Sequence, residues 1–256
     1  MKDLKNKIVL ITGGTSGIGL ACAHIFAEEG CNVIITGRRT DRLKKIKEEL
    51  ENKFKIKCLT LEMDVRDLKN VENTIALLDE EWKKINILIN NAGLSRGLNK
   101  IQDGDPNDWN EMIDTNVKGV LHVSKFVIPL MLENNDGHII NIGSIAGQEV
   151  YPGGNIYSAS KYALDAITKS MRIDLIETPI KVSTVDPGMV KSEFSLVRFK
   201  GDKERAEVPY KGFEPLKPED VADAVMYIAS RDGNVNIAQI VIFPKAQAST
   251  TVIKRE

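Results

Sequence analysis

The sequence contains few of the residues that form disulfides or bind metals. It has three cysteines and three histidines in 256 residues. Cys22, Cys31 and Cys58 are odd in number and form no C-x-x-C pair, so we expect free thiols and a reducing, cytoplasmic location. The histidines are scattered along the chain, and we therefore predict no metal site.

The sequence also lacks an excess of charge of either sign and any long apolar run. With 35 basic and 36 acidic residues the net charge is −1, which gives no electrostatic reason to expect binding to nucleic acid or to an anionic membrane. No apolar run approaches the roughly 18 residues of a transmembrane helix. The short apolar run near the N-terminus has no cleavage-type end, which favours a first strand over a signal peptide.

Short apolar runs and helical patterns alternate along most of the chain. Strands are expected at Ile8–Thr12, Val33–Gly37, Ile56–Met63, Ile87–Asn90, His138–Ile142, Val182–Val185 and Ile237–Phe243. Helices are expected at Gly17–Glu29, Arg42–Asn52, Leu68–Lys83, Pro106–Glu133, Ile156–Glu177 and Pro218–Ser230. This alternation predicts an α/β fold, with a parallel sheet and helices on both faces. No repeat, low-complexity segment or linker divides the chain, so residues 1–256 are expected to form one domain.

The pattern around residues 138–168 brings together a hydroxyl, a phenol and an amine. Ser144 follows the apolar run His138–Ile142, which places it at the carboxyl end of a buried strand, where open α/β sheets bind ligands. Tyr157 and Lys161 are four residues apart in a helical pattern, so they should share one face of that helix. The three side chains are therefore expected to converge.

Such a trio suits acid–base chemistry on a substrate oxygen. A free phenol has a pKa of about 10, and a neighbouring ammonium lowers it. Tyr157 is thus predicted to pass a proton to or from the substrate, while Ser144 hydrogen-bonds the same oxygen. Taken alone, Y-x-x-x-K fits equally a surface helix with an unremarkable Tyr and Lys.

A glycine-rich turn, TGGTSGIG at residues 12–19, joins the first strand to the first helix. Glycines let the backbone approach a pyrophosphate, whose charge is held at the helix N-terminus. The spacing G-x-x-x-G-x-G differs from the G-x-G-x-x-G pattern of dinucleotide sites, and three glycines also fit a simple tight turn. The position between a buried strand and an amphipathic helix favours nucleotide binding.

The end of the second strand bears on which dinucleotide is bound. An NAD site carries an acid there for the ribose 2′-hydroxyl, whereas this chain has Gly37-Arg38-Arg39. Arg38 is placed to pair with a 2′-phosphate, which favours NADP. The alternative is that both arginines belong to a solvated basic face formed with the cations that follow them.

Together with polar turns after other strands, these residues resemble the short-chain dehydrogenase/reductase family. The similar motifs are TGGTSGIG, the NNAG of residues 90–93, Asn116, Ser144, the YSASK of residues 157–161 and Pro187-Gly188. The match covers about the first 190 residues and the strand near residue 240. The resemblance implies a single domain with a Rossmann-type, doubly wound, seven-stranded parallel sheet.

The resemblance also implies residue roles. Ser144 would hold the substrate oxygen and Tyr157 would exchange the proton, while Lys161 would bind the nicotinamide ribose and lower the pKa of Tyr157. Asn116, which by itself reads as a solvent-facing or back-bonded helix residue, would support a water-linked proton relay. Cofactor contacts are expected at Gly13, Thr15, Ser16, Gly17, Ile18, Gly19, Arg38, Arg39, Asp64, Val65, Asn91, Gly93, Tyr157, Lys161, Pro187, Gly188, Val190 and Ser192. Ser192 stands where the family often has Thr, and it keeps the hydroxyl.

A narrower resemblance, to the NADP-dependent serine and 3-hydroxy acid dehydrogenases, rests on residues 194–201, 151–157 and 243–244. It implies a homotetramer acting on small hydroxy acids such as serine, allo-threonine or 3-hydroxypropionate. The polar segment 189–217 is expected to form a lid. In it, Arg198 is the leading candidate to bind the substrate carboxylate, ahead of Arg96 and Lys191. A solvated loop position or a subunit contact are the alternatives for Arg198.

Two other functions remain open from the sequence. One is a reductase of another carbonyl compound, such as a 3-ketoacyl thioester, a sugar or a steroid. The other is a catalytically idle NADP-binding sensor or scaffold, because fold does not fix function; the complete Ser144–Tyr157–Lys161 set speaks against it. The predicted helices 106–133 and 156–177 are apolar over more than one face, which predicts either a subunit contact or complete burial within one subunit.

Overall fold

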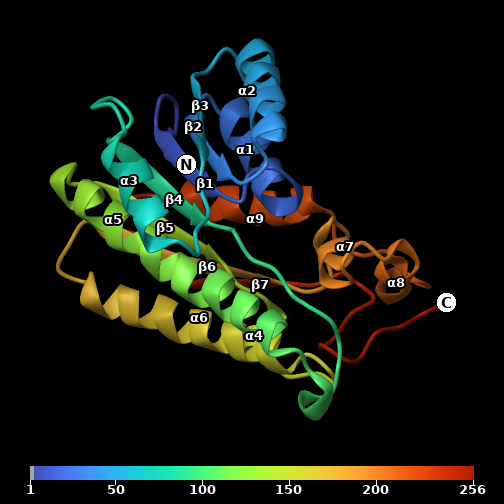
Figure 1. Cartoon of the computed structure of the whole chain (residues 1–256). Coiled ribbons are helices and arrows are strands. Elements are labelled where there is room, and N and C mark those ends of the chain that lie inside the picture. Colours follow the sequence, from blue (N-terminus) through green and yellow to red (C-terminus); the bar gives the residue numbers. More distant parts are fainter. Residues whose placement is uncertain (1–2) are drawn as a thin grey trace.

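The apolar runs form strands because their Val and Ile side chains are buried on both faces of one sheet. The computed structural model describes residues 3–256. Its strands are β1 (Ile8–Thr12), β2 (Asn32–Gly37), β3 (Cys58–Glu62), β4 (Ile85–Asn90), β5 (Gly137–Ile142), β6 (Ile180–Pro187) and β7 (Gln239–Ile242). They pair in parallel in the order β3-β2-β1-β4-β5-β6-β7 (Figure 1). The predicted seven-stranded parallel sheet is confirmed.

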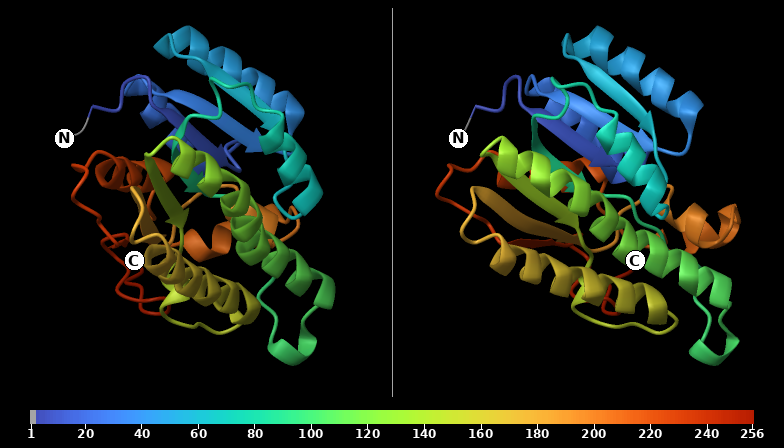
Figure 2. Two further views of the ribbon diagram at one scale, coloured as in Figure 1. Left: turned by 90° about the vertical axis from the view of Figure 1, so that its left-hand side faces the viewer. Right: turned by 60° about the vertical axis from the view of Figure 1, so that its left-hand side comes forward.

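Two helical layers cover this sheet. One face carries α1 (Gly17–Glu28), α2 (Thr40–Phe54) and α9 (Pro218–Ala229), and the other carries α3 (Leu68–Ala76), α5 (Gly119–Glu133) and α6 (Asn155–Asp174). Each layer buries its own apolar cluster, with Phe26 and Leu50 in the first and Val127 and Met131 in the second. In both views of Figure 2, α2 and α6 lie on opposite sides of the molecule. The doubly wound arrangement expected from the sequence is therefore present.

Three segments differ from the helices expected from periodicity. The predicted helix Leu68–Lys83 ends at Ala76, and a turn at Asp79 then buries Trp82. The predicted helix Pro106–Glu133 is divided into α4 (Pro106–Ile113), a π-helical turn (Asp114–Lys118) and α5.

The third difference lies in the expected lid, residues 189–217. It contains two short helices, α7 (Phe194–Arg198) and α8 (Lys203–Glu207), and a 3₁₀ turn (Val208–Tyr210). The ends of this segment are joined, because the N–H of Lys191 donates to Leu216 O at 2.8 Å and the N–H of Leu216 donates to Met189 O at 2.9 Å. In Figure 1, α7 and α8 stand at the end of the molecule where the C-terminus lies.

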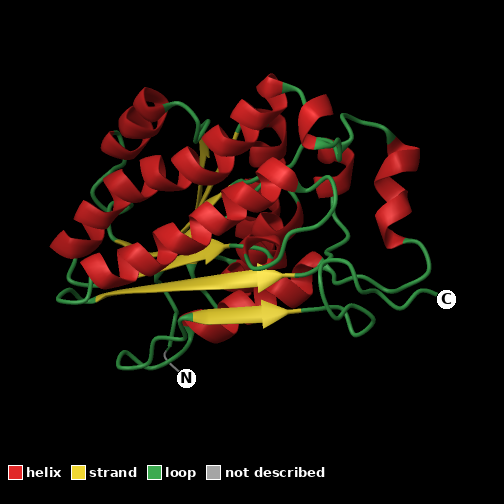
Figure 3. Cartoon of the chain, turned by 90° about the horizontal axis from the view of Figure 1, so that it is seen from below, coloured by secondary structure: helices red, strands yellow, loops and turns green. Residues whose placement is uncertain are grey.

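The strand order places the site. The chain runs from β1 to β2 and β3 on one side of β1 and then crosses to β4 on the other side. Open α/β sheets bind ligands at the carboxyl ends of strands beside such a reversal. In Figure 3 the strand arrows point toward the end of the molecule that carries the C-terminus. Within residues 3–256, no helix has both the length and the apolar character needed to span a membrane.

Candidate active site

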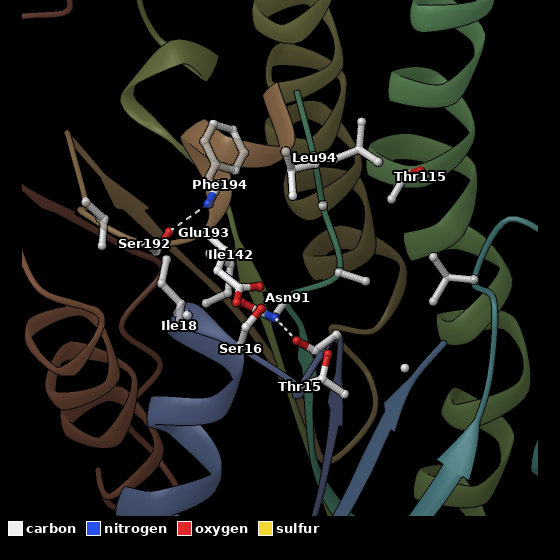
Figure 4. A pocket seen from close by; sticks show the side chains of 18 of the residues that line it. Thr15, Ser16, Ile18, Asn91, Leu94, Thr115, Ile142, Ser192, Glu193 and Phe194 are labelled. Atoms are coloured by element: carbon white, nitrogen blue, oxygen red, sulfur yellow. Dashed lines mark hydrogen bonds between the residues drawn. The ribbon is translucent and has the colours of Figure 1, made fainter. Parts of the chain in front are cut away.

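A cleft of about 340 Å³ opens at the carboxyl edge of the sheet. Its walls come from the loops that follow β1 to β6, several of which appear in Figure 4. Most of the expected cofactor residues line it: Gly13, Thr15, Ser16, Gly17, Ile18, Arg38, Arg39, Asp64, Val65, Asn91, Gly93, Tyr157, Lys161, Pro187, Gly188, Val190 and Ser192. Ser144 also lies in the wall. The cleft thus gathers residues from across the chain.

The glycine-rich turn forms a backbone-lined wall that fits a pyrophosphate. Gly13 and Gly17 have φ values of +65° and +54°, a region that favours glycine. A Cβ at Gly17 would project toward Ser192, 3.4 Å from its Cβ. Ser16, at the N-cap of α1, makes no side-chain hydrogen bond to the first turn of that helix, which leaves the N–H groups there open to an anion.

Gly19 packs closely against the other residues of the turn. It does not belong to the cleft wall. A Cβ at this position would lie 2.3 Å from Asn91 Nδ2 and 2.7 Å from Gly13 O. Asn91 itself donates from Nδ2 to Thr12 O at 2.9 Å and to Gly13 O at 3.2 Å. Gly19 therefore permits the close approach that lets Asn91 fix the turn, and the expectation that it lines the pyrophosphate stays a prediction.

Arg38 lies at the rim of the cleft with its side chain 55% exposed. Its Nη1 is 3.9 Å from Asp64 Oδ2, which is a loose contact. Asp64 is held mainly by Arg66, whose hydrogen bonds, the shortest being 2.6 Å, keep the pKa of Asp64 below its ordinary value. Arg38 is thus a cation with little internal competition, and it suits a 2′-phosphate at this end of the cleft.

Arg39 is bound much more firmly. Its Nη2 donates to Thr15 Oγ1 and Ser16 Oγ, both at 2.8 Å, and its Nη1 donates to Glu193 Oε2 at 2.8 Å. Arg42 donates to Glu193 Oε1 at 2.8 Å. This network connects the glycine turn to the first residues of the expected lid. Glu193 was missed by the sequence argument, because no local pattern marks a residue that pairs with cations more than 150 positions away.

Ser144, Tyr157 and Lys161 meet in the wall of the cleft. The phenol of Tyr157 is hydrogen-bonded to Ser144, and Ser144 Oγ also accepts from the N–H of Ala146 at 3.1 Å. Lys161 is 7% exposed; its Nζ donates to Ile142 O at 2.8 Å and lies 5.9 Å from the centre of the Tyr157 ring. The arrangement places an acid–base group and a hydrogen-bond donor side by side.

The charge balance at Tyr157 differs from the one expected. Burial is the largest effect and raises the pKa of Tyr157 to about 12; the hydrogen bond from Ser144 and the charge of Arg198 oppose the rise. Arg198 is the cation among the largest effects on Tyr157, while burial lowers the pKa of Lys161 to about 8. The Lys161 ammonium binds the Ile142 carbonyl, and its expected effect on the Tyr157 pKa stays a prediction.

Asn116 lies in the π-helical turn and is only 1% exposed. Its Oδ1 accepts from the N–H of Leu94 at 2.8 Å, and its Nδ2 donates to Leu94 O at 2.8 Å and to Ser160 Oγ at 3.0 Å. The alternative of a solvent-facing or back-bonded residue in a regular helix therefore does not hold, and the role of Asn116 in a proton relay stays a prediction. Asn116 sits behind Gly93, whose Cβ would be 3.3 Å from Asn116 Oδ1 and 3.8 Å from Lys161 Nζ.

Arg198 lies over the phenol ring of Tyr157. Its guanidinium carbon is 5.3 Å from the centre of the Tyr157 ring, 5.2 Å from that of Phe194 and 5.9 Å from that of Tyr151. Its Nη2 donates to Tyr151 Oη at 2.8 Å, while its Nε is buried without a hydrogen-bond partner. A buried donor without a partner is costly unless a ligand satisfies it.

The two other candidates for the substrate carboxylate are occupied. Arg96 forms a two-pronged pair with Glu111, at 2.7 and 3.1 Å. Lys191 pairs with Glu207 at 2.7 Å. The expectation that Arg96 or Lys191 binds the substrate carboxylate therefore loses its physical basis, whereas the same expectation for Arg198 keeps it.

Residues 3–256 show no cluster of three or more His, Cys, Asp or Glu side chains arranged to hold a metal ion. The three cysteines are buried and free, and burial raises the pKa of each thiol to about 12. Groups of this kind are inert as nucleophiles at neutral pH. Ser144, Tyr157 and Lys161 line the cleft, and Arg198 lies beside it over the Tyr157 ring.

Comparison with known proteins agrees with this geometry. The family model described as short chain dehydrogenase matches residues 7–202. The NADP-dependent 3-hydroxy acid dehydrogenase of Schizosaccharomyces pombe is 41% identical over 257 residues, covering 100% of this chain and 99% of that protein. Sulfoacetaldehyde reductase 2 of Chromohalobacter salexigens is 43% identical, covering 94% of this chain and 95% of the relative. The closed form of serine dehydrogenase complexed with NADP⁺ superposes with a TM-score of 0.91 at 41% identity, covering 97% of this chain and 99% of the other.

Proposed function

Because the chain belongs to the short chain dehydrogenase family, we propose that it is an NADP-dependent oxidoreductase that moves a hydride between the nicotinamide and the carbinol carbon of a small 3-hydroxy acid. Serine, allo-threonine and 3-hydroxypropionate, or malonic semialdehyde in the reverse direction, are substrates of this type. The observation that carries the proposal is the partnerless buried Nε of Arg198 beside the phenol of Tyr157.

The cofactor, when bound, supplies or accepts the hydride, and the protein supplies binding and proton transfer. The turn at residues 13–18 and the N-terminus of α1 would hold the pyrophosphate, and Arg38 would pair with the 2′-phosphate. Ser144 and Tyr157 hold the substrate oxygen, and the phenol oxygen of Tyr157 gives or takes its proton. The raised pKa keeps this phenol protonated at neutral pH, which suits proton donation to a carbonyl oxygen.

Arg198 gives the site its preference for an acid. The carboxylate of a 3-hydroxy acid is two carbons from the carbinol carbon, so an anchor must lie close to the proton-transfer group, as Arg198 does. A carboxylate that accepts from Nε satisfies the buried donor with a charge-assisted bond. Tyr151 holds the other side of the guanidinium, and Gly154 leaves room for the Tyr151 ring, 2.4 Å from where a Cβ would lie.

We extend the proposal to the assembly and the lid. Apolar side chains of α5 and α6 remain exposed, which supports a homotetramer formed through these helices; they include Leu121 (43%), Leu132 (43%), Tyr162 (42%) and Ile173 (72%). Segment 189–217 carries Arg198, so closure of a lid there would couple to binding of the substrate acid. Three buried free thiols support a cytoplasmic location.

Replacing Arg198 tests the function. Arg198→Ala should raise KM for a 3-hydroxy acid by about 10-fold or more, from a lost charge-assisted interaction of about 1.5–3 kcal/mol, and should change KM for its methyl ester much less. Lys200→Ala is the matched control, because Lys200 is a neighbouring cation that pairs with Asp108 at the surface; it should leave both constants near wild type. Equal losses for acid and ester in Arg198→Ala would mean general damage to the lid and would remove the anchor.

A further inference from the structure

A carboxylate is buried behind the active site, and no step of the proposed reaction uses it. Asp186, near the end of β6, is 5% exposed. Its Oδ2 accepts from Gln148 Nε2 at 2.9 Å and from Gln239 Nε2 at 2.5 Å, and its Oδ1 accepts from Thr184 Oγ1 at 3.0 Å. Hydrogen bonds donated to both oxygens stabilise the ionised form. Burial raises the pKa of Asp186, and these hydrogen bonds together with the charge of Lys161 oppose that rise.

This carboxylate lies against the same peptide that Lys161 contacts. A Cβ at Gly143 would be 1.7 Å from Asp186 Oδ1, so the carboxylate oxygen occupies the space above the Gly143 α-carbon. Lys161 Nζ donates to the carbonyl oxygen of Ile142, the preceding residue, at 2.8 Å. The buried ammonium and the buried carboxylate therefore both face the Ile142–Gly143 peptide at the end of β5.

From this juxtaposition we infer that Asp186 is a positioning residue whose negative charge keeps Lys161 protonated in the active site. The inference rests on the proposed function, whose active site Lys161 lines beside Tyr157. Burial favours the neutral amine, and an opposite charge against the same peptide, in a medium of low polarity, favours the ammonium. The directions agree: burial lowers the pKa of Lys161 to about 8, and the charge of Asp186 opposes that fall.

Among the described neighbours of Lys161, Asp186 is the group of opposite charge. On its own helix, Tyr157 is the nearby titratable group, with its ring centre 5.9 Å from Nζ. The loops after β4 and β5 present Gly93 and the Ile142 carbonyl, which do not ionise. Asp186 also raises the pKa of Tyr157. The pH profile of activity alone would therefore reflect the titration of both Tyr157 and Lys161. The test therefore needs a readout of the amine itself.

Competitive acetylation provides that readout. The enzyme, without cofactor or substrate, is labelled with acetic anhydride over a pH series, and mass spectrometry of the peptide carrying Lys161 gives the midpoint of its titration. Asp186→Asn should move this midpoint downward by about 1 pH unit. Asp186→Ser should move the midpoint in the same direction. Because serine leaves space above Gly143, this variant provides a second test if asparagine packs poorly there. Asp174→Asn, an exposed carboxylate at the far end of α6, should leave it in place.

The inference is overturned if the Lys161 midpoint in both Asp186 variants stays at the wild-type value or rises. Because labelling needs no substrate, this failure is distinct from failure of the proposed function, which would appear as wild-type enzyme without turnover of hydroxy acids. In the active enzyme, the alkaline limb of the pH profile for carbonyl reduction should also move downward in Asp186→Asn. Thermal unfolding of each variant confirms that the folded enzyme is being compared.

Discussion

At the scale of single residues, burial and the nearby positive charge have opposite effects on the pKa of the Tyr157 phenol. Helical spacing correctly places Tyr157 and Lys161 within one site, since both line the cleft. Spacing does not reveal how deeply the phenol is buried or where the ammonium points. The ammonium binds the Ile142 carbonyl and Arg198 lies over the ring instead. The cation that acts on the phenol thus comes from a segment 41 residues further along the chain.

Replacing Tyr157 by Phe removes the phenol oxygen and leaves the ring that packs against Phe194. We expect kcat to fall by at least about 10²-fold, because general acid–base help contributes about 10²–10⁴-fold. The dissociation constant of NADPH, measured by fluorescence titration, should stay near wild type. A variant with near-normal kcat would exclude Tyr157 as the proton-transfer group.

Arg38 is expected to determine the preference for the phosphorylated cofactor. Arg38→Leu should lower kcat/KM for NADP by about 10- to 150-fold, the value of a charge-assisted bond of about 1.5–3 kcal/mol, and should change kcat/KM for NAD little. Lys45→Leu makes the same change of charge on an exposed part of α2 and serves as control. Equal use of NAD and NADP by the wild-type enzyme would refute this role before any variant is made.

At the scale of elements, the π-helical turn Asp114–Lys118 carries the candidate site residue Asn116, whose position periodicity describes poorly. The apolar spacing through α4 and α5 predicts one helix, and the extra residue in the turn rotates Asn116 inward to bond Leu94 and Ser160. Turns of this kind often occur at functional sites. The sequence marks Asn116 only through the family resemblance, because one inserted residue leaves almost no trace in a hydrophobic pattern.

The turn between β1 and α1 depends on Gly19 for close packing. Gly19→Ala should destabilise the fold by about 1–3 kcal/mol, as overpacking does, since the new methyl group would meet Asn91 and Gly13. It should also weaken NADP binding, because Asn91 fixes the turn. Gly233→Ala is the control, since a Cβ there meets no atom within 4 Å. Equal melting temperatures for Gly19→Ala and wild type would contradict the close approach.

At the scale of the whole molecule, strand–helix alternation was enough to predict the parallel sheet and its two helical layers. The first strand was placed at its observed bounds, Ile8–Thr12, because an unbroken apolar run is a clear signal of a buried parallel strand. The sequence pattern does not predict the helices α7 and α8, because five-residue helices are too short to show periodicity. Long-range pairs such as Arg39–Glu193 depend on how the lid packs, which local patterns do not specify.

The exposed apolar residues of α5 and α6 lead to a prediction about assembly. Light scattering of the purified protein at micromolar concentration should give a mass four times that of the chain. Ile173→Asp, which places a charge on an exposed position of α6, should reduce this mass. A stable monomer in the wild-type sample would show that these residues are simply solvated.

The central claim is that the cleft joins NADP-dependent hydride transfer to recognition of a substrate acid. The most direct test is a screen of the wild-type enzyme for formation or loss of NADPH absorbance. The panel would contain 3-hydroxy acids, their methyl esters, 3-ketoacyl thioesters, sugars and steroids. We predict the highest kcat/KM for a small 3-hydroxy acid or its oxidised partner, at least about 10-fold above the matching ester. Equal or better turnover of the ester, preference for a thioester, sugar or steroid, or no turnover at all would contradict the account.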